Sequence, residues 1–190
     1  STYRDYGEED DIGYDISCNL ASLNIKNVMT SKFHETVHRA MDALVTVSDS
    51  TFIKNAPAVA KANRDLRSVG LGVMNLHGYL ASVGIPYESK DAIDFANLFF
   101  RTMNYASLVR SNEQAKEKTP YIGFEGSTYH TGEYFKQYLD DNKFLEGISD
   151  KVLKLFDGIH IPKQQDWEKL SESVKEHGLY SAYRLAIAPY

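Results

Sequence analysis

Two successive patterns near the end of the sequence set the fold class: Lys163-Gln-Gln-Asp-Trp-Glu-Lys-Leu-Ser-Glu-Ser-Val-Lys-Glu-His177, and then Tyr183-Arg-Leu-Ala-Ile-Ala188. The first predicts a helix, because Pro162 precedes it and Gly178 follows it, as is usual at the two ends of a helix. The second is an apolar run typical of a buried strand. A helix that leads into a buried strand predicts an α/β fold.

The rest of the sequence is expected to be predominantly helical. Long helices are predicted from about Lys32, with Ser31 as the N-cap, and over 90–118, with Ser89 as the N-cap and Ile93 on the apolar face. Shorter helices are predicted over 57–66, 68–82, 131–141 and 150–156. Only 18–29 alternates loosely enough for a short strand or an extended segment. No repeat or linker divides residues 1–190, so we expect a single segment.

The composition fits a folded domain and excludes several classes of protein. Of the 190 residues, 43% are hydrophobic and 25% are charged, so a core can form. The formal net charge of −5 argues against a nucleic-acid-binding surface. No apolar run approaches the roughly 18 residues of a membrane span, and no signal peptide pattern is seen. A single cysteine cannot form an intrachain disulfide or a cysteine-based zinc cluster, and we expect a cytoplasmic protein.

The most conspicuous short motif is His34-Glu35-Thr-Val-His38, which fits the H-E-x-x-H pattern of zinc hydrolases. On a helix this spacing puts both imidazoles on one face, where they could hold zinc while the glutamate acts as general base. A zinc site needs a third ligand, and the next glutamate is Glu88, far along the chain. The sequence therefore favours a core-facing helix that carries two histidines on its flank.

Two further patterns have a structural and a functional interpretation. Gly70-Leu-Gly-Val-Met-Asn75 begins like a dinucleotide-binding fingerprint but ends in Asn where the fingerprint needs Gly. It lies within the helix expected over 68–82, so close helix packing is the preferred interpretation. Cys18 lies at the entrance to an apolar stretch, and a lone cysteine there is more often a small buried hydrophobe than a reactive thiol.

Both ends of the sequence look internal to a longer polypeptide. The chain starts at Ser1 without a Met, in a polar stretch with an acidic run over 8–11. It stops in an apolar run over 185–190, whereas natural termini are usually polar and exposed. We therefore expect an internal fragment.

Several segments together resemble one family, the large (alpha) catalytic subunit of class I ribonucleotide reductase, and specifically its class Ib type. The resemblance rests on Asp15-Ile-Ser-Cys-Asn-Leu-Ala-Ser-Leu-Asn-Ile25, Val69-Gly-Leu-Gly-Val-Met-Asn-Leu-His-Gly-Tyr-Leu80 and His177-Gly-Leu-Tyr-Ser-Ala-Tyr-Arg-Leu-Ala-Ile-Ala-Pro189. Segments 87–100 and 123–135 also look like the family, in the same order. The resemblance covers nearly the whole chain, but only a fraction of the family's longer subunit.

The resemblance implies part of the ten-stranded α/β barrel that holds the active site of a ribonucleoside-diphosphate reductase. In that family a thiyl radical removes the 3′ hydrogen of the ribonucleoside diphosphate. A pair of thiols then supplies reducing equivalents as the 2′ hydroxyl leaves as water. Cys18 matches one member of this redox pair, which reverses the local interpretation. A transient catalytic disulfide agrees with a cytoplasmic protein.

The same resemblance implies the partners. A small subunit with a dimetal site would supply the radical, a redoxin would supply electrons, and the full-length subunit would form a homodimer. The family's nucleotide effectors bind elsewhere in the subunit, so no metal or cofactor is expected in this segment. No nucleic acid or membrane partner is expected.

Parts of the family's machinery are missing from this sequence. The radical cysteine lies in an Asn-x-Cys-x-Glu motif that would come just before Ser1, and the second redox cysteine belongs far upstream. Pro189 matches the first residue of the family's phosphate-binding turn, but Tyr190 stands where Thr is expected. The 190-residue chain alone is therefore expected to be inactive.

Two alternatives stay open at this point. One is a zinc-dependent hydrolase that uses His34, Glu35 and His38, which stoichiometric zinc lost in His38→Ala would favour. The other is a non-catalytic interaction module derived from a reductase. A natural start codon at the N-terminus and a genuine stop after Tyr190 would favour the second.

Overall fold

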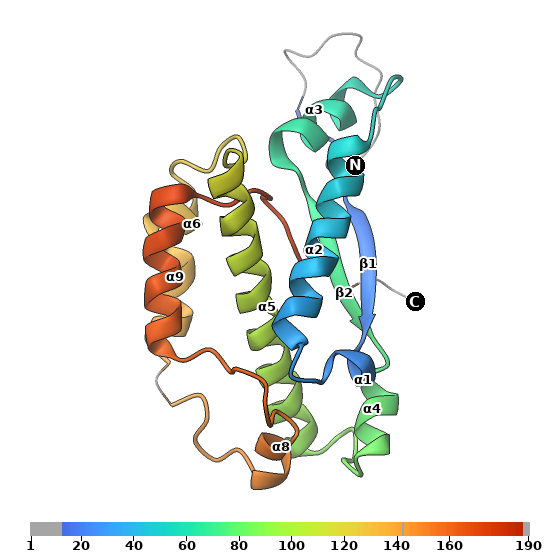
Figure 1. Cartoon of the computed structure of the whole chain (residues 1–190), viewed down its shortest axis with the longest axis vertical. Coiled ribbons are helices and arrows are strands. Elements are labelled where there is room, and N and C mark those ends of the chain that lie inside the picture. The colour runs from blue at the N-terminus through green and yellow to red at the C-terminus, as the bar shows by residue number, and fades with distance from the viewer. Residues whose placement is uncertain (1–12, 142, 188–190) are drawn as a thin grey trace.

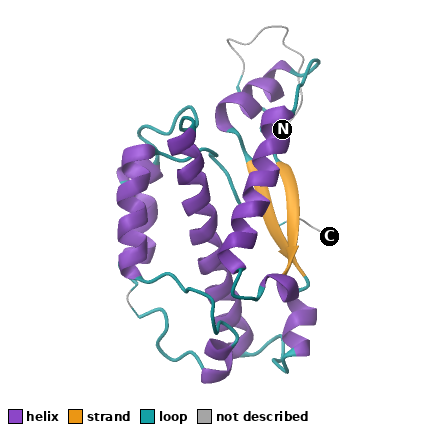
Figure 2. Ribbon diagram, viewed as in Figure 1, coloured by secondary structure: helices purple, strands orange, loops and turns teal. Residues whose placement is uncertain are grey.

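The computed structural model describes residues 13–141 and 143–187, most of which lie in helices (Figure 2). The elements follow one another in the order β1 (Asn19–Asn24), α1 (Ile25–Val28), α2 (Phe33–Ser50), α3 (Pro57–Leu66), β2 (Val69–Met74), α4 (Leu76–Ser82), α5 (Lys90–Glu117), α6 (Thr128–Thr131), α7 (Glu133–Leu139), α8 (Asp150–Lys154) and α9 (Gln164–His177). The helices expected over 57–66, 150–156 and 163–177 are confirmed to within two residues, and a strand does lie within 18–29. The helix expected over 131–141 is interrupted at residue 132, between α6 and α7.

The two longest helices begin differently. α5 starts as predicted, with Ser89 as the N-cap, whose Oγ accepts a backbone hydrogen bond from the first turn at 3.2 Å. α2 starts at Phe33 with Lys32 in the N-cap position and no side-chain cap, so the prediction of Ser31 as N-cap is wrong. Thr30 takes over part of that role, because its Oγ1 accepts a hydrogen bond from the N–H of Lys32 at 3.2 Å.

β1 and β2 form a parallel pair, with Asn19 opposite Val69 and Asn24 opposite Met74. Parallel neighbours need a long crossover connection, which α1, α2 and α3 supply. Figure 1 shows α2 crossing the sheet, and α2 contacts both strands. This arrangement is an α/β unit of mostly helical content. The ten-stranded barrel implied by the resemblance is not seen in the residues that the structure describes.

The helix expected over 68–82 is wrong in its first half. β2 occupies Val69–Met74, and α4 begins only at Leu76. Successive residues of a strand face opposite sides, so the glycines at 70 and 72 share one face while Leu71 and Val73 share the other. Asn75 separates the two elements with φ 69°, a left-handed conformation that asparagine tolerates better than most residues.

The strand expected over 183–188 forms only in part. Leu185 makes one parallel bridge with Leu71 of β2, and backbone hydrogen bonds of 2.8–3.2 Å join the two segments. Tyr183 and Ile187 are 57% and 78% exposed while Arg184 is 4% exposed, so the expectation of a buried strand is confirmed only in part. Beyond β2, no strand lies beside this segment among the described residues, and the side chains of Tyr183 and Ile187 stay uncovered.

The main core lies between the sheet, α2 and α5. Phe33 and Val37, which the sequence placed on one face of α2, are fully buried, and they share an apolar cluster with Phe99 and Met103 of α5. Ile93, which helical spacing assigned to the same face of α5, is instead 59% exposed. A second cluster, between α5, α7 and α9, surrounds Trp167 of α9.

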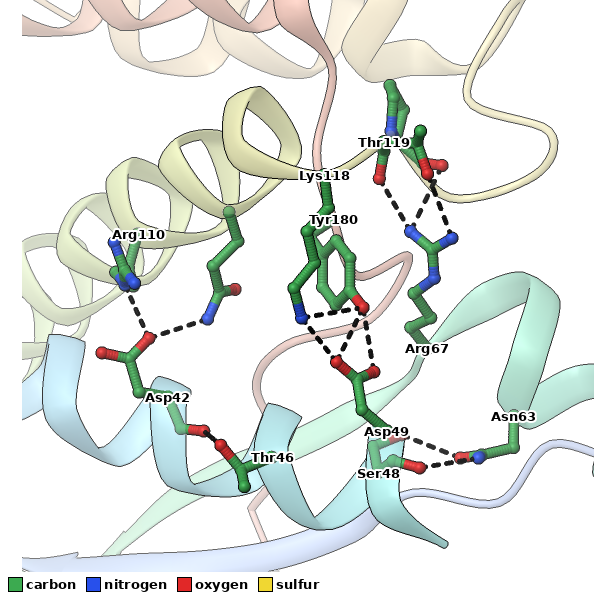
Figure 3. A network of polar contacts seen from close by, with 12 residues as sticks. Asp42, Thr46, Ser48, Asp49, Asn63, Arg67, Arg110, Lys118, Thr119 and Tyr180 are labelled. Carbon is green, nitrogen blue, oxygen red and sulfur yellow. Dashed lines mark hydrogen bonds and ion pairs between the residues drawn. The ribbon is translucent and has the colours of Figure 1, made fainter. Parts of the chain in front are cut away.

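A polar network ties α2 to α5 and to the segment after α9 (Figure 3). Asp42 of α2 accepts hydrogen bonds from Arg110 at 2.6 Å and from Gln114 at 2.9 Å, both on α5. Two turns further along α2, Asp49 accepts hydrogen bonds from Lys118 Nζ at 2.7 Å and from Tyr180 Oη at 2.8 Å. These contacts fix α2 against α5, and α2 in turn covers the sheet.

Candidate functional site at Cys18

Cys18 lies directly before β1, and its side chain is exposed. The local expectation of a small buried hydrophobe is therefore wrong for this residue. Partial burial nevertheless raises the pKa of the thiol, because removing water disfavours the thiolate. The site thus holds an accessible thiol that is mainly protonated at neutral pH.

Gly70 of β2 lets three segments meet beside this thiol. A Cβ at position 70 would lie 3.0 Å from Cys18 Sγ and 3.0 Å from the Cβ of Ala186. It would also lie 2.5 Å from Cδ2 of Leu20, a distance that real Cβ contacts do not reach. Because glycine has no side chain, the entrance to β1 and the chain around Ala186 can both approach β2 closely.

Gly72 serves the same purpose one step further along β2. A Cβ there would lie 2.4 Å from the carbonyl oxygen of Ala186, so any other residue would push the segment over 183–187 away. The expectation that these glycines permit close packing agrees with this geometry, although they lie in a strand and not in a helix. The local sequence pointed to the two glycines but not to the residues they contact. Those contacts follow from the pairing of β2 with β1 and with the chain around Ala186.

The geometry brings together the three motifs that carry the family resemblance. Cys18 comes from the first, Gly70 from the second and Ala186 from the third. Pro189 lies outside the described residues, three positions after Ala186 in the sequence. Cys18 is the one cysteine of the sequence, so any disulfide it forms needs a thiol from another segment or molecule.

The zinc motif on α2 has a different setting. His34 donates a hydrogen bond from Nε2 to the carbonyl oxygen of His160 at 2.8 Å, which occupies one of its two nitrogens. Nε2 of His38 is buried and meets no hydrogen-bonding partner among the described residues. Burial lowers the pKa of both imidazoles. Glu35 points to another partner, Arg39, at 2.5 Å.

A metal site would need a further ligand near these imidazoles. Within 13–141 and 143–187, no group of three or more His, Cys, Asp or Glu side chains is arranged to hold a metal ion. The described residues therefore give the zinc-hydrolase alternative no support. The same part of the chain also has no helix that is both long and apolar enough to cross a membrane.

Comparisons with known proteins agree with one another. The family model described as the ribonucleotide reductase barrel domain matches residues 5–190. The ribonucleoside-diphosphate reductase subunit alpha of Bacillus subtilis is 55% identical over 100% of this chain, which spans 27% of that relative. Proteins of the same name from Mycoplasma genitalium and Treponema pallidum are 39% and 33% identical over 94% and 92% of this chain. The chain spans 25% and 18% of these two relatives.

The match extends through all three segments that meet at Cys18, and it covers far more of the chain than any short motif. The chain also spans only about a quarter of the length of the Bacillus relative. The family model and the 55% identity over the whole chain show that this chain belongs to the ribonucleotide reductase family, within the barrel domain of the large subunit.

Proposed function

We propose that this chain is part of the large (alpha) subunit of a cytoplasmic class Ib ribonucleoside-diphosphate reductase. The observation that carries the proposal is the exposed thiol of Cys18 at the meeting point of β1, β2 and the chain around Ala186. The named relatives are ribonucleoside-diphosphate reductase alpha subunits, which supports the reaction. The class Ib assignment rests on the resemblance of the sequence motifs.

In this proposal Cys18 is one of two thiols that reduce the substrate. The pair loses two hydrogen atoms and closes into a disulfide. One hydrogen replaces the 2′ hydroxyl group on the ribose carbon, and the other combines with the departing hydroxyl group to give water. The raised pKa keeps the Cys18 thiol protonated at neutral pH, so that in this proposal it brings a proton as well as an electron.

The remaining parts of the reaction come from outside this chain. A radical cysteine and a second redox thiol belong to other segments of the polypeptide, since the sequence holds one cysteine. A small subunit with a dimetal site would start the radical, a redoxin would reduce the disulfide, and two full-length large subunits would pair. Nucleotide effectors would bind elsewhere. Pro189 would begin the turn that holds the substrate phosphates.

The proposal is tested with Cys18→Ser in the full-length polypeptide that contains this segment. The assay measures deoxyribonucleotide formed from a ribonucleoside diphosphate, with the radical-generating subunit and a redoxin present. We expect turnover to fall to background, because serine cannot form the disulfide, while the substrate still binds.

The matched control is Gly13→Ala, close to Cys18 in sequence at a position with no atom within 4 Å of the added Cβ. It should keep the activity of the unmodified enzyme. A Cys18→Ser enzyme with full turnover would disprove the redox role. The 190-residue chain alone should give no product, because the radical cysteine is not part of it.

A further inference from the structure

A separate cavity lies between α5, α7 and the chain over 182–185, with a volume of about 710 Å³. Neither Cys18 nor Gly70 lines it, so it is distinct from the thiol site. Its volume falls within the roughly 300–1,000 Å³ that is usual for small-molecule sites. Its wall combines aromatic rings with two arginines, Arg101 and Arg184.

Arg184 is a buried charge without a matching anion. The residue is 4% exposed, and its Nε and Nη1 atoms meet no hydrogen-bond acceptor in the part of the chain that the structure describes. Nη2 donates a hydrogen bond to the hydroxyl of Tyr129 at 3.3 Å, and the guanidinium lies 5.1 Å from the centre of that ring. A guanidinium stays protonated, so burial alone cannot remove its charge. Such a group is costly unless an anion completes it.

Arg101 is only partly neutralised on the same wall. Its side chain is 11% exposed, and Nη1 lies 3.2 Å from Asp141, a carboxylate that is itself 45% exposed. Nε has no acceptor among the described residues. Burial lowers the pKa of Arg101, which is the sign of a charge short of compensation. The other carboxylate of the cavity, Asp94, is paired with Lys90 at 2.5 Å.

Two tyrosine hydroxyls add further donors. Tyr134 and Tyr138 both line the cavity, and each hydroxyl oxygen accepts a hydrogen bond from Asn104 at 2.8 Å. Their own O–H protons are left available to donate. Burial raises the pKa of Tyr134, so this proton is retained at neutral pH. The wall therefore carries guanidinium donors, on Arg101 and Arg184, for which the described residues supply no acceptor, beside the two paired carboxylates.

We propose that this cavity binds the oxyanion group of a small molecule, a phosphate or a carboxylate, between Arg101 and Arg184. Planar guanidinium groups bind both kinds of oxyanion through paired hydrogen bonds. The anion would draw the Arg184 side chain toward the cavity and satisfy N–H groups that now lack acceptors. This inference does not depend on the reductase assignment.

The test uses thermal unfolding of the 190-residue chain, with inorganic phosphate in one titration and citrate in another. Sodium chloride keeps the ionic strength constant, so that general screening does not contribute. We expect a saturable rise in the midpoint temperature with at least one of the two anions. A preference for phosphate or for citrate identifies the oxyanion. No saturable rise with either anion would overturn the proposal.

Two variants and a control locate the site. Arg184→Gln should weaken the apparent Kd at least about tenfold, the usual effect of losing a charged hydrogen bond. Tyr134→Phe should weaken the apparent Kd several-fold. Because this variant removes only the hydroxyl group and keeps the ring, it still tests the site if Arg184→Gln fails to fold. Arg39→Gln removes the same charge from a side chain that is 78% exposed on α2, away from the cavity. An equal loss in Arg39→Gln would show a non-specific charge effect and refute the site.

Discussion

The two faces of the β1–β2 sheet differ in how far their side chains are buried. On the face toward the helices, Leu71 is 1% exposed and belongs to the same apolar cluster as Phe99 of α5. On the other face the chain carries glycine at 70 and 72, while Leu20 and Met74 are 54% and 47% exposed. Cys18 lies on this second face, against Gly70.

This difference shows which face of the sheet contributes most of the stability and which face contributes little. Large side chains fill the space between the sheet and the helices, where burial contributes most to folding. On the opposite face the glycines at 70 and 72 let three segments approach one another around the thiol. Substitutions on the buried face should therefore change mainly the free energy of unfolding. A substitution of the thiol on the opposite face should change mainly the reaction.

The largest effect is expected from Leu71→Ala. Removing a fully buried leucine leaves a cavity and should lower the free energy of unfolding by about 3 kcal/mol. Urea denaturation of the 190-residue chain measures it. The matched variant is Leu20→Ala on the exposed face of the same sheet, which should cost about 0.5 kcal/mol or less. Equal losses in the two variants would mean that the faces do not differ as described.

The next effect is expected from Gly72→Ala. The added Cβ would lie 2.4 Å from the carbonyl oxygen of Ala186, and backbone cannot turn aside as a side chain can. The backbone shift that avoids this clash should lower the free energy of unfolding by about 1–3 kcal/mol and loosen the segment over 183–187. Hydrogen exchange should speed up at the N–H of Leu71, which donates to that segment. Gly13→Ala is the control, and a similar cost there would contradict the explanation.

A much smaller change in stability is expected from Cys18→Ser. The side chain is exposed, so the free energy of unfolding should stay within about 0.5 kcal/mol of the unmodified chain. Loss of turnover in the full-length enzyme, with stability preserved, would separate chemistry from folding on this face. A loss of several kcal/mol would instead make Cys18 a core residue.

The smallest effect concerns the ionisation of Cys18. Its pKa is raised in the folded chain, so less thiolate is present at any given pH and alkylation by iodoacetamide should be slower than in the unfolded chain. The alkylation rate should reach half its maximum at a higher pH when the protein is folded. The same chain in urea is the control. Because folding favours the protonated thiol, its contribution to stability is present below the unfolded pKa and is lost as the pH rises through the folded one. A folded midpoint below the urea midpoint would contradict this assignment.

Much of the helical framework could be predicted from local signals. Ser89 and Gly178 are strong capping residues, and α5 begins directly after Ser89 while α9 ends directly before Gly178. The apolar spacing of Phe33 and Val37 also located the buried face of α2. Each of these signals acts within a few residues, so the sequence alone contains the information.

The strands and the site depend on contacts between distant segments. Over 69–74 only Leu71 and Met74 favour a helix, and pairing with β1 and with the segment over 183–186 makes the stretch a strand. The exposure of Cys18 follows from its position on the open face of the sheet, which composition cannot reveal. Nothing near Arg184 in the sequence indicates that its guanidinium lies buried beside Tyr129 from another segment.

The hydrogen bond from Tyr180 to Asp49 has a consequence for biosynthesis. The two residues are 131 positions apart (Figure 3). The bridge between Leu71 and Leu185 likewise joins an early segment to a late one. At roughly 10 residues per second, more than about ten seconds of translation separate the two partners. During that interval α2 and β2 leave the ribosome without their final neighbours, so their apolar surfaces are open to a chaperone.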